Sequence, residues 1–131
     1  MNAATVKRGM LLFAHGARDP RWAEPFEDVA RRVARRDPAC AVQLAFLEFM
    51  TPTLHDAGHV LAQAGCTHVD IVPLFLGAGG HVRKDLPVLL AALASTYPDV
   101  QWQLRRAIGE IDSVIEAMAG AALLAADEPP R

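Results

Sequence analysis

The sequence lacks several features that would point to particular classes of protein. Only two of its 131 residues are cysteines, Cys40 and Cys66, and they do not form a CxxC motif. Two cysteines cannot build a disulfide framework, so we expect a reduced, cytoplasmic protein. No apolar run approaches the roughly 18 residues of a membrane span, and the N-terminus lacks the apolar region of a signal peptide. We therefore expect no membrane partner.

A basic excess is also missing. Thirteen Lys and Arg residues against fifteen Asp and Glu residues leave a formal net charge of −2. Proteins that bind nucleic acid carry a basic footprint, so no nucleic-acid partner is expected. Hydrophobic residues make up 52% of the chain, which is enough for a packed core. This length favours one domain, over residues 1–126, with residues 127–131 as a frayed C-terminal tail.

Short apolar runs alternate along the chain with segments of helical periodicity. Four strands are predicted, at residues 10–14, 41–47, 69–76 and 100–104. The last of them alternates strictly between apolar and polar residues, as a half-exposed edge strand does. Four strand–helix units predict an α/β fold: a single three-layer domain with a four-stranded, mostly parallel sheet.

Two predicted helix boundaries and one predicted packing face can be tested. Thr51 and Pro52 are suited to the N-cap and first position of the second helix, which Gly65 would end. The last helix is expected over residues 111–126. It carries apolar residues at helical spacing on one face, which indicates a packed amphipathic helix; these are Ile111, Ile115, Met118 and Ala122.

Polar side chains follow three of the predicted strands. His15 follows the first strand, Glu48 the second, and His81 the loop after the third. In open α/β sheets, ligands bind outside the carboxyl ends of the strands, so these side chains should converge. Two imidazoles and one carboxylate suit a divalent transition metal and leave coordination positions open.

Other roles for these and the remaining histidines stay open. A histidine in a turn is often a cap or a satisfied polar group, and Glu48 before a helix also suits the helix dipole. His55 and His59 have the i, i+4 spacing of a metal pair, but no third ligand accompanies them. His68 opens a strand, where a structural role is expected.

A glycine-rich loop and three basic residues surround the second histidine and the first turn. The loop at residues 77–80 includes Gly79 and Gly80, which suit either a phosphate at a helix N-terminus or a flat, bulky ligand. Arg18, Arg83 and Lys84 are either solvated surface charges or a basic rim for a carboxylate-bearing substrate.

Three motifs resemble those of a known enzyme family. They are AHGARDP at residues 14–20, FLE at 46–48 and VPLFLGAGGHVRKDLP at 72–87. Together they are similar to the short sirohydrochlorin cobaltochelatases, the small class II tetrapyrrole chelatases of the CbiX type. The resemblance extends from about residue 9 to residue 108. Ala17 departs from it, because serine is commoner at that position.

The resemblance implies a flavodoxin/chelatase-like half-unit and a lyase of the cobaltochelatase/ferrochelatase kind. Such an enzyme inserts Co²⁺ or Fe²⁺, as substrate, into sirohydrochlorin for cobalamin or sirohaem biosynthesis, without a nucleotide. It also implies that His15 and His81 bind the metal and accept pyrrole protons, with Glu48 as a third participant. Short members work as homodimers with the tetrapyrrole between subunits.

Two other functions compete with this one. A histidine phosphatase also presents His-Gly after its first strand, but it needs an arginine directly before that histidine, where this chain has Ala14. A non-catalytic carrier of metal or tetrapyrrole would use the same binding residues as the enzyme. Only turnover separates the carrier from the chelatase.

Overall fold

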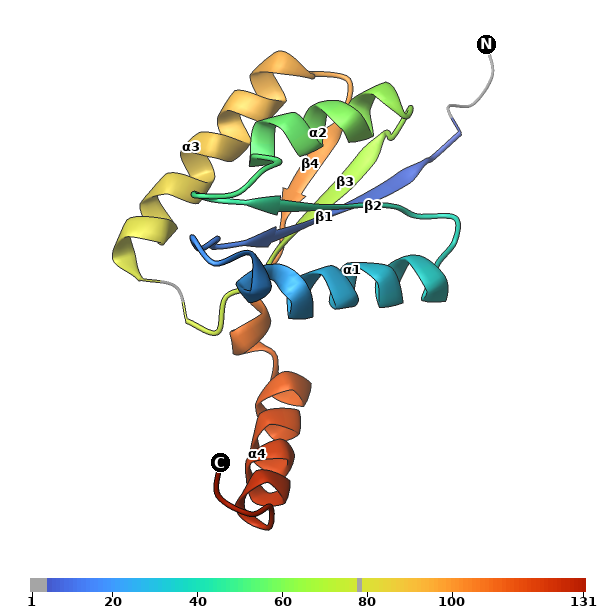
Figure 1. Ribbon diagram of the computed structural model, residues 1–131. Helices are drawn as coiled ribbons and strands as arrows, with labels where there is room; N and C mark the ends of the chain where they lie inside the picture. Colours follow the sequence, from blue (N-terminus) through green and yellow to red (C-terminus); the bar gives the residue numbers. More distant parts are fainter. Residues whose placement is uncertain (1–4, 78) are drawn as a thin grey trace.

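The computed structural model describes residues 5–77 and 79–131 and centres on a four-stranded sheet. Its strands are β1 (Arg8–Ala14), β2 (Ala41–Phe46), β3 (His68–Pro73) and β4 (Gln101–Leu104). Their order across the sheet is β2-β1-β3-β4, and each neighbouring pair is parallel (Figure 1). The predicted four-stranded sheet is confirmed, with β4 at its edge.

Helices cover the two faces of the sheet unequally. The longer helices are α1 (Glu24–Arg36), α2 (Leu54–Gln63), α3 (Gly80–Thr96) and α4 (Asp112–Ala126), and two short 3₁₀ helices are η1 (Pro20–Ala23) and η2 (Ile108–Glu110). Helix α1 lies on one face, and α2 and α3 lie on the other (Figure 1). This is the predicted three-layer arrangement. In the described part of the chain, no helix is both long enough and apolar enough to cross a membrane.

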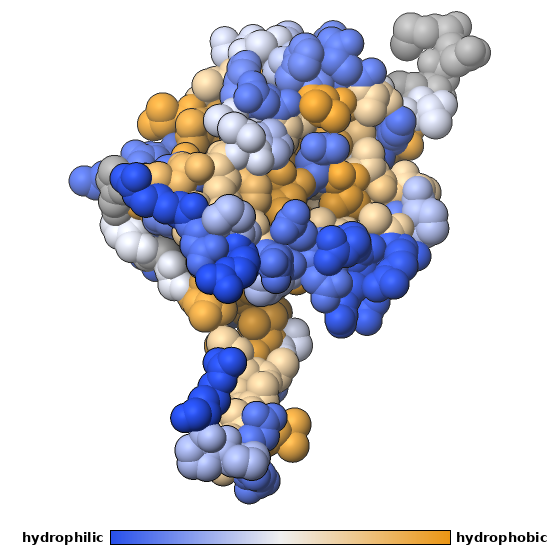
Figure 2. Space-filling view, viewed as in Figure 1, coloured by the Kyte–Doolittle hydropathy of each residue, from blue (hydrophilic) through white to orange (hydrophobic). Residues whose placement is uncertain are grey.

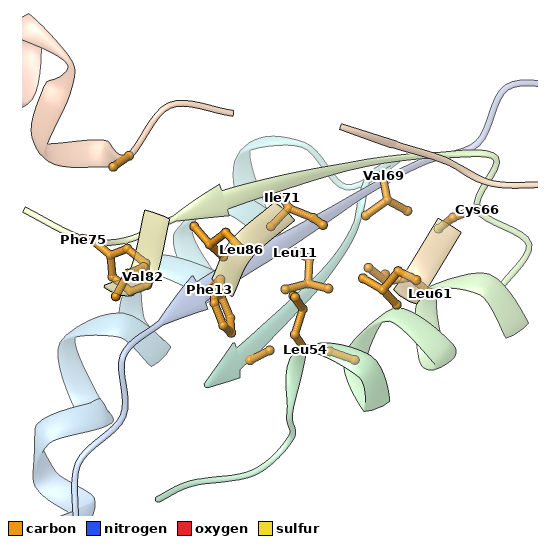
Figure 3. Close-up of a cluster of buried hydrophobic side chains, with 14 residues drawn as sticks. Leu11, Phe13, Leu54, Leu61, Cys66, Val69, Ile71, Phe75, Val82 and Leu86 are labelled. Carbon is orange, nitrogen blue, oxygen red and sulfur yellow. The ribbon is translucent and has the colours of Figure 1, made fainter. Parts of the chain in front are cut away.

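The main core lies between the sheet and helices α2 and α3 (Figure 3). Successive side chains of a strand point to opposite faces, so alternate residues of β1 and β3 meet these helices. They pack against apolar residues of α2 and α3. The largest buried side chains of the described residues are at most 1% exposed: Phe13, Leu11, Ile71 and Val69 from the strands, Leu61 from α2 and Leu93 from α3. Burial therefore explains why the strand residues on this face are apolar.

The layer on the other face is thinner. Its buried cluster consists of Ala14, Ala23 and Phe46, with Trp22 and Phe26 packed against them only partly buried. Leu12 of β1, which alternates with Leu11 and Phe13 and so faces this side, is 2% exposed. No residue of α1 itself is fully buried. The α1 side therefore contributes less to the core than the α2/α3 side.

The second helix begins later than the sequence predicts. Thr53, not Thr51, is the N-cap of α2, and its Oγ1 accepts a hydrogen bond from the backbone N–H of Asp56 at 3.2 Å. The carbonyl of Pro52 instead accepts from the N–H of Phe46 at 2.9 Å. Backbone pairing with the end of β2 therefore keeps this segment out of the helix.

The last helix is not packed, and that expectation was wrong. Helix α4 has no buried residue, and it projects away from the sheet (Figure 1). Ile115 and Met118, which were expected to face the core, are 46% and 39% exposed. The chain turns away at η2, where the N–H of Gly109 donates to the carbonyl of Phe75 at 2.9 Å. Apolar periodicity identified a helix, but it does not specify what covers the helix.

Candidate functional site

The carboxyl ends of β1 and β2 are joined by hydrogen bonds that continue past the strands. The N–H of Leu47 donates to the carbonyl of Ala14 at 2.9 Å, and the N–H of Glu48 donates to the carbonyl of His15 at 3.1 Å. Parallel register therefore carries into the loops and places His15 beside Glu48. This is the convergence that the positions of the two residues predict.

His15 and Glu48 form a direct side-chain pair. The Nε2 atom of His15 lies 2.9 Å from the Oε1 atom of Glu48, and each side chain is 48% exposed. The imidazole also meets the ring of Phe75 edge-on, with ring centroids 6.3 Å apart. One side of the pair thus rests on an apolar ring, and the other remains open to water.

Gly16 makes this close approach possible. Its φ of +95° is in the left-handed region that favours glycine. A Cβ atom there would lie 1.9 Å from the backbone carbonyl oxygen of Glu48. The residue after His15 must therefore lack a side chain for the two loops to meet.

His81 lies in the first turn of α3, directly after the loop that follows β3. Its side chain is outside the described residues, so its convergence on His15 stays a prediction. Gly79 is the N-cap of α3. In the described part of the chain, and apart from their neighbours in the sequence and the backbone of α3 itself, no atom lies within 4 Å of the place where a Cβ would stand on Gly77, Gly79 or Gly80. The space beside this backbone is open, as close approach by a flat ligand requires.

His15 and Glu48 place one nitrogen donor and one oxygen donor side by side. The 2.9 Å between Nε2 and Oε1 is the length of a hydrogen bond, so both atoms would turn from each other to a metal ion on binding it. Imidazole and carboxylate are both ligands of divalent transition metals. Among the described side chains, which do not include that of His81, no group of three or more His, Cys, Asp or Glu residues could hold a metal. The described residues thus supply a pair of donors.

The three expected basic residues lie at different places along this edge. The guanidinium carbon of Arg18 lies 4.8 Å from the centre of the Phe49 ring. Arg83 lines a cavity of about 190 Å³, and Phe75, which contacts His15, lines the same cavity. Lys84 is exposed in the first turns of α3. Arg18 and Arg83 are thus connected to the surroundings of the His15–Glu48 pair through Phe49 and Phe75.

Two further arginines were not identified from the sequence. Arg105 and Arg106 follow β4 directly and line the same cavity as Arg83. The Nε atom of Arg105 donates to Oδ1 of Asp70 at 2.7 Å, whereas Arg106 makes no ion pair within the described part of the chain. Their position just after a strand was the available signal, because carboxyl ends of parallel strands share one edge.

The i, i+4 histidine pair on α2, His55 and His59, contacts Tyr97. The Nδ1 atom of His59 is hydrogen-bonded to the hydroxyl of Tyr97 at 2.5 Å, and the ring centroids of His55 and Tyr97 are 6.1 Å apart. His68 is hydrogen-bonded to the hydroxyl of Thr67 at 2.7 Å. His59 thus connects α2 to the C-terminal end of α3, whereas His68 is bonded to its neighbour in the sequence.

Comparison with known proteins gives the same family from sequence and from structure. The family model described as CbiX matches residues 9–122. A sirohydrochlorin cobaltochelatase from Methanosarcina barkeri is 34% identical over 87 residues, which are 66% of this chain and 67% of that protein.

Solved structures support the same relationship. A protein from Marinobacter aquaeolei, described as a CbiX protein of cobalamin (vitamin B12) biosynthesis, superposes with a TM-score of 0.80 and 29% identity, covering 92% of this chain and 98% of that one. SirB from Bacillus subtilis with Fe³⁺ superposes with a TM-score of 0.75 and 26% identity. That match covers 86% of this chain but only 44% of SirB.

Proposed function

The chain belongs to the CbiX family, and we propose from this premise that it inserts Co²⁺ or Fe²⁺ into sirohydrochlorin in cobalamin or sirohaem biosynthesis. It would act as a sirohydrochlorin cobaltochelatase/ferrochelatase-like lyase and use no nucleotide. The observation that carries the proposal is the His15–Glu48 pair, half exposed at the carboxyl edge of the sheet.

The metal is a substrate, so its site must bind it and also release it. We assign His15 and Glu48 as two donors, with His81 as the third. An imidazole and a carboxylate on an exposed edge leave the remaining coordination positions to water. Ring nitrogens of the tetrapyrrole can then replace that water one at a time.

Insertion also requires proton acceptors. The metal forms bonds to the ring nitrogens, and two pyrrole N–H bonds lose their protons to the site and then to solvent. A neutral imidazole is suited to accept a proton near neutral pH, which assigns this step to His15 and His81. The carboxylate of Glu48, 2.9 Å from His15, would stabilise the imidazolium that results.

The tetrapyrrole is flat and fringed with carboxylates, and the edge offers matching features. The open space beside Gly79 and Gly80 allows a ring to approach the backbone closely. Arg18, Arg83 and Lys84 would meet the carboxylates around the ring, since guanidinium groups pair with carboxylates in two-point contacts.

Assembly and location belong to the same proposal. The chain matches less than half the length of SirB, which favours a homodimer in which two copies supply the two halves. Cys40 and Cys66 are both free thiols, which supports a cytoplasmic location. We also propose that residues 1–126 are the chelatase-like domain and residues 127–131 a frayed C-terminal tail.

Metal insertion can be followed directly by the absorbance of sirohydrochlorin. Co²⁺ and Fe²⁺ are offered separately, and the uncatalysed reaction under the same conditions is the blank. We expect acceleration with at least one metal and loss of acceleration in His81→Ala. His68→Ala is the matched control, because His68 begins β3 at the opposite end of the sheet and is hydrogen-bonded to Thr67, and it should retain turnover. Binding of metal or tetrapyrrole without acceleration would instead identify a carrier.

A further inference from the structure

Phe49 follows Glu48 directly and exposes a large apolar ring to solvent. It is 56% exposed, whereas the other four phenylalanines of the chain are buried or half-buried. A single exposed apolar residue is common on protein surfaces and needs no explanation by itself. The backbone of Phe49 and its place beside a candidate metal donor make it unusual.

The backbone of Phe49 is held in a conformation that a bulky residue seldom adopts. Its φ of +66° is in the left-handed region, where no other non-glycine residue of the described chain is found. Glycine would adopt this conformation without a steric cost. The loop is closed at its base by the backbone N–H of Phe46, which donates to the carbonyl of Pro52 at 2.9 Å. A strained aromatic residue kept at such a place indicates that its ring has a function.

The ring of Phe49 lines a groove of about 450 Å³ beside the His15–Glu48 pair. The loop after β1 contributes Arg18 to the wall of this groove, and the loop after β2 contributes Phe49 and Met50. The same two loops carry His15 and Glu48. A group bound in the groove would therefore lie next to the proposed metal donors.

Apolar groups also lie on the other side of His15. Strand β1 lies between β2 and β3, so the segments that follow β2 and β3 flank this histidine. After β3, Phe75 meets the imidazole edge-on and Leu76 is 66% exposed. The space-filling view shows apolar surface along the projecting helix α4 as well (Figure 2), but α4 carries no histidine that could hold a metal beside it.

A tetrapyrrole bound at this edge presents two kinds of surface. Its rim carries carboxylates, for which the basic residues of the edge are suited, whereas its two faces are conjugated and apolar. Aromatic side chains stack on such faces in offset or tilted arrangements. We propose that Phe49 stacks on one face of the tetrapyrrole and so holds the macrocycle over the metal bound by His15 and Glu48.

Arg18 supports this role of Phe49 by its position and its charge. Its guanidinium carbon lies 4.8 Å from the centre of the Phe49 ring, so the cation covers one face of the ring and helps to hold it in place. The opposite face is left for the ligand. A guanidinium stacked on a ring still presents N–H groups at its edge, so Arg18 can bind a rim carboxylate while Phe49 contacts the face.

This role of Phe49 rests on the proposed function, because it names the residue by which the same site binds its tetrapyrrole. Failure of the proposed function would appear in the wild-type protein, as metal insertion without acceleration. Failure of the stacking role would appear only when wild type and Phe49 variants are compared. Binding of metal-free sirohydrochlorin can be measured whether or not the protein turns it over.

Phe49→Gly is the informative variant, since it removes the ring and also relieves the left-handed backbone. The midpoint of urea unfolding should therefore rise, whereas metal-free sirohydrochlorin, titrated by its absorbance, should bind about 10-fold more weakly. KM should rise by a similar factor with little change in kcat, because the ring contact exists before and during insertion. Phe49→Tyr keeps an aromatic face and should bind within about 3-fold of wild type. Val60→Ala is the matched control, since Val60 is 46% exposed on α2, and it should leave binding unchanged.

Weaker binding in Phe49→Gly, with an unfolding midpoint at or above that of wild type, supports the proposal. Unchanged binding in this variant overturns it. Weaker binding together with a lower midpoint also overturns it, because the ring would then serve only the structure of the loop. Sedimentation equilibrium should give wild type and Phe49→Gly the same mass. Dissociation of the variant alone would identify Phe49 as a contact between subunits and would overturn the stacking role.

Discussion

The buried core and the carboxyl edge of the sheet are built from the same strands but work in opposite ways. Phe13 is 0% exposed in the core, whereas His15, two residues later, has a side chain that is 48% exposed. Core residues stabilise the fold through packing, and edge residues contribute little packing but carry polar groups to one place. We therefore expect substitutions at Phe13 to lower the stability of the fold, and substitutions at His15, two residues later, to lower the activity without unfolding the protein.

The largest expected effect is the loss of activity on removing the edge imidazole. His15→Ala should reduce metal insertion by about 100-fold or more, since a positioned acid or base contributes about 10²- to 10⁴-fold. Its free energy of unfolding should stay within about 0.5 kcal/mol of wild type, as for other exposed positions. Turnover and urea unfolding measured on the same preparation test both statements. A folded variant with normal turnover would remove His15 from the proposed mechanism.

The reciprocal experiment is a truncation in the core. Phe13→Ala should lower the free energy of unfolding by about 3–5 kcal/mol, because it removes a fully buried ring and leaves a cavity. The fraction that remains folded should still bind Co²⁺, as the His15–Glu48 pair is unaltered. Val88→Ala is the control, since this exposed residue should shift stability by no more than about 0.5 kcal/mol. An equal loss in both variants would contradict the division between core and surface.

Gly16 belongs to both regions, and its substitution should affect both. In Gly16→Ala the new Cβ meets the carbonyl of Glu48 in a left-handed backbone conformation, so we expect a stability loss of about 1–3 kcal/mol together with weaker metal binding. Gly120→Ala in α4 is the matched control, because no atom lies within 4 Å of its Cβ position. It should stabilise the helix slightly. Unchanged metal binding in a destabilised Gly16→Ala would show that the two loops need not meet.

The smallest expected effect concerns the arginine cavity. Arg106→Ala should raise KM for the tetrapyrrole about 10-fold with little change in kcat, because it removes one charge-assisted contact to a carboxylate. Arg8→Ala, at the opposite end of β1, should leave both constants unchanged. A fall in kcat at constant KM would instead place Arg106 close to the reacting atoms.

Much of the fold could be predicted because local patterns determine it. Short uncharged runs indicated the buried strands, and strict alternation in residues 100–104 indicated the edge strand β4. The third strand was predicted to continue to residue 76, but β3 ends at Pro73, which has no backbone N–H to donate to a neighbouring strand. The start of α2 was misplaced by two residues because Pro52 pairs with Phe46, a contact between segments that no local pattern contains.

The candidate site was predictable for a related reason. Parallel strands bring their carboxyl ends to one edge, so His15 and Glu48 could be placed together from their positions alone. The arginines after β4 were missed although the same rule applies to them. The free position of α4 was also missed, because an apolar stripe is equally consistent with a helix covered by its own chain or by another.

By itself the sequence determined the strands, most helices, the order of β and α units and the residues at the end of each strand, because these depend on spacing along the chain. Only the tertiary structure decided that His15 lies 2.9 Å from Glu48 and that His59 is hydrogen-bonded to Tyr97. It also decided that α4 projects from the sheet instead of packing on it (Figure 1). These features depend on contacts between segments far apart in the chain, where packing rather than periodicity selects the outcome.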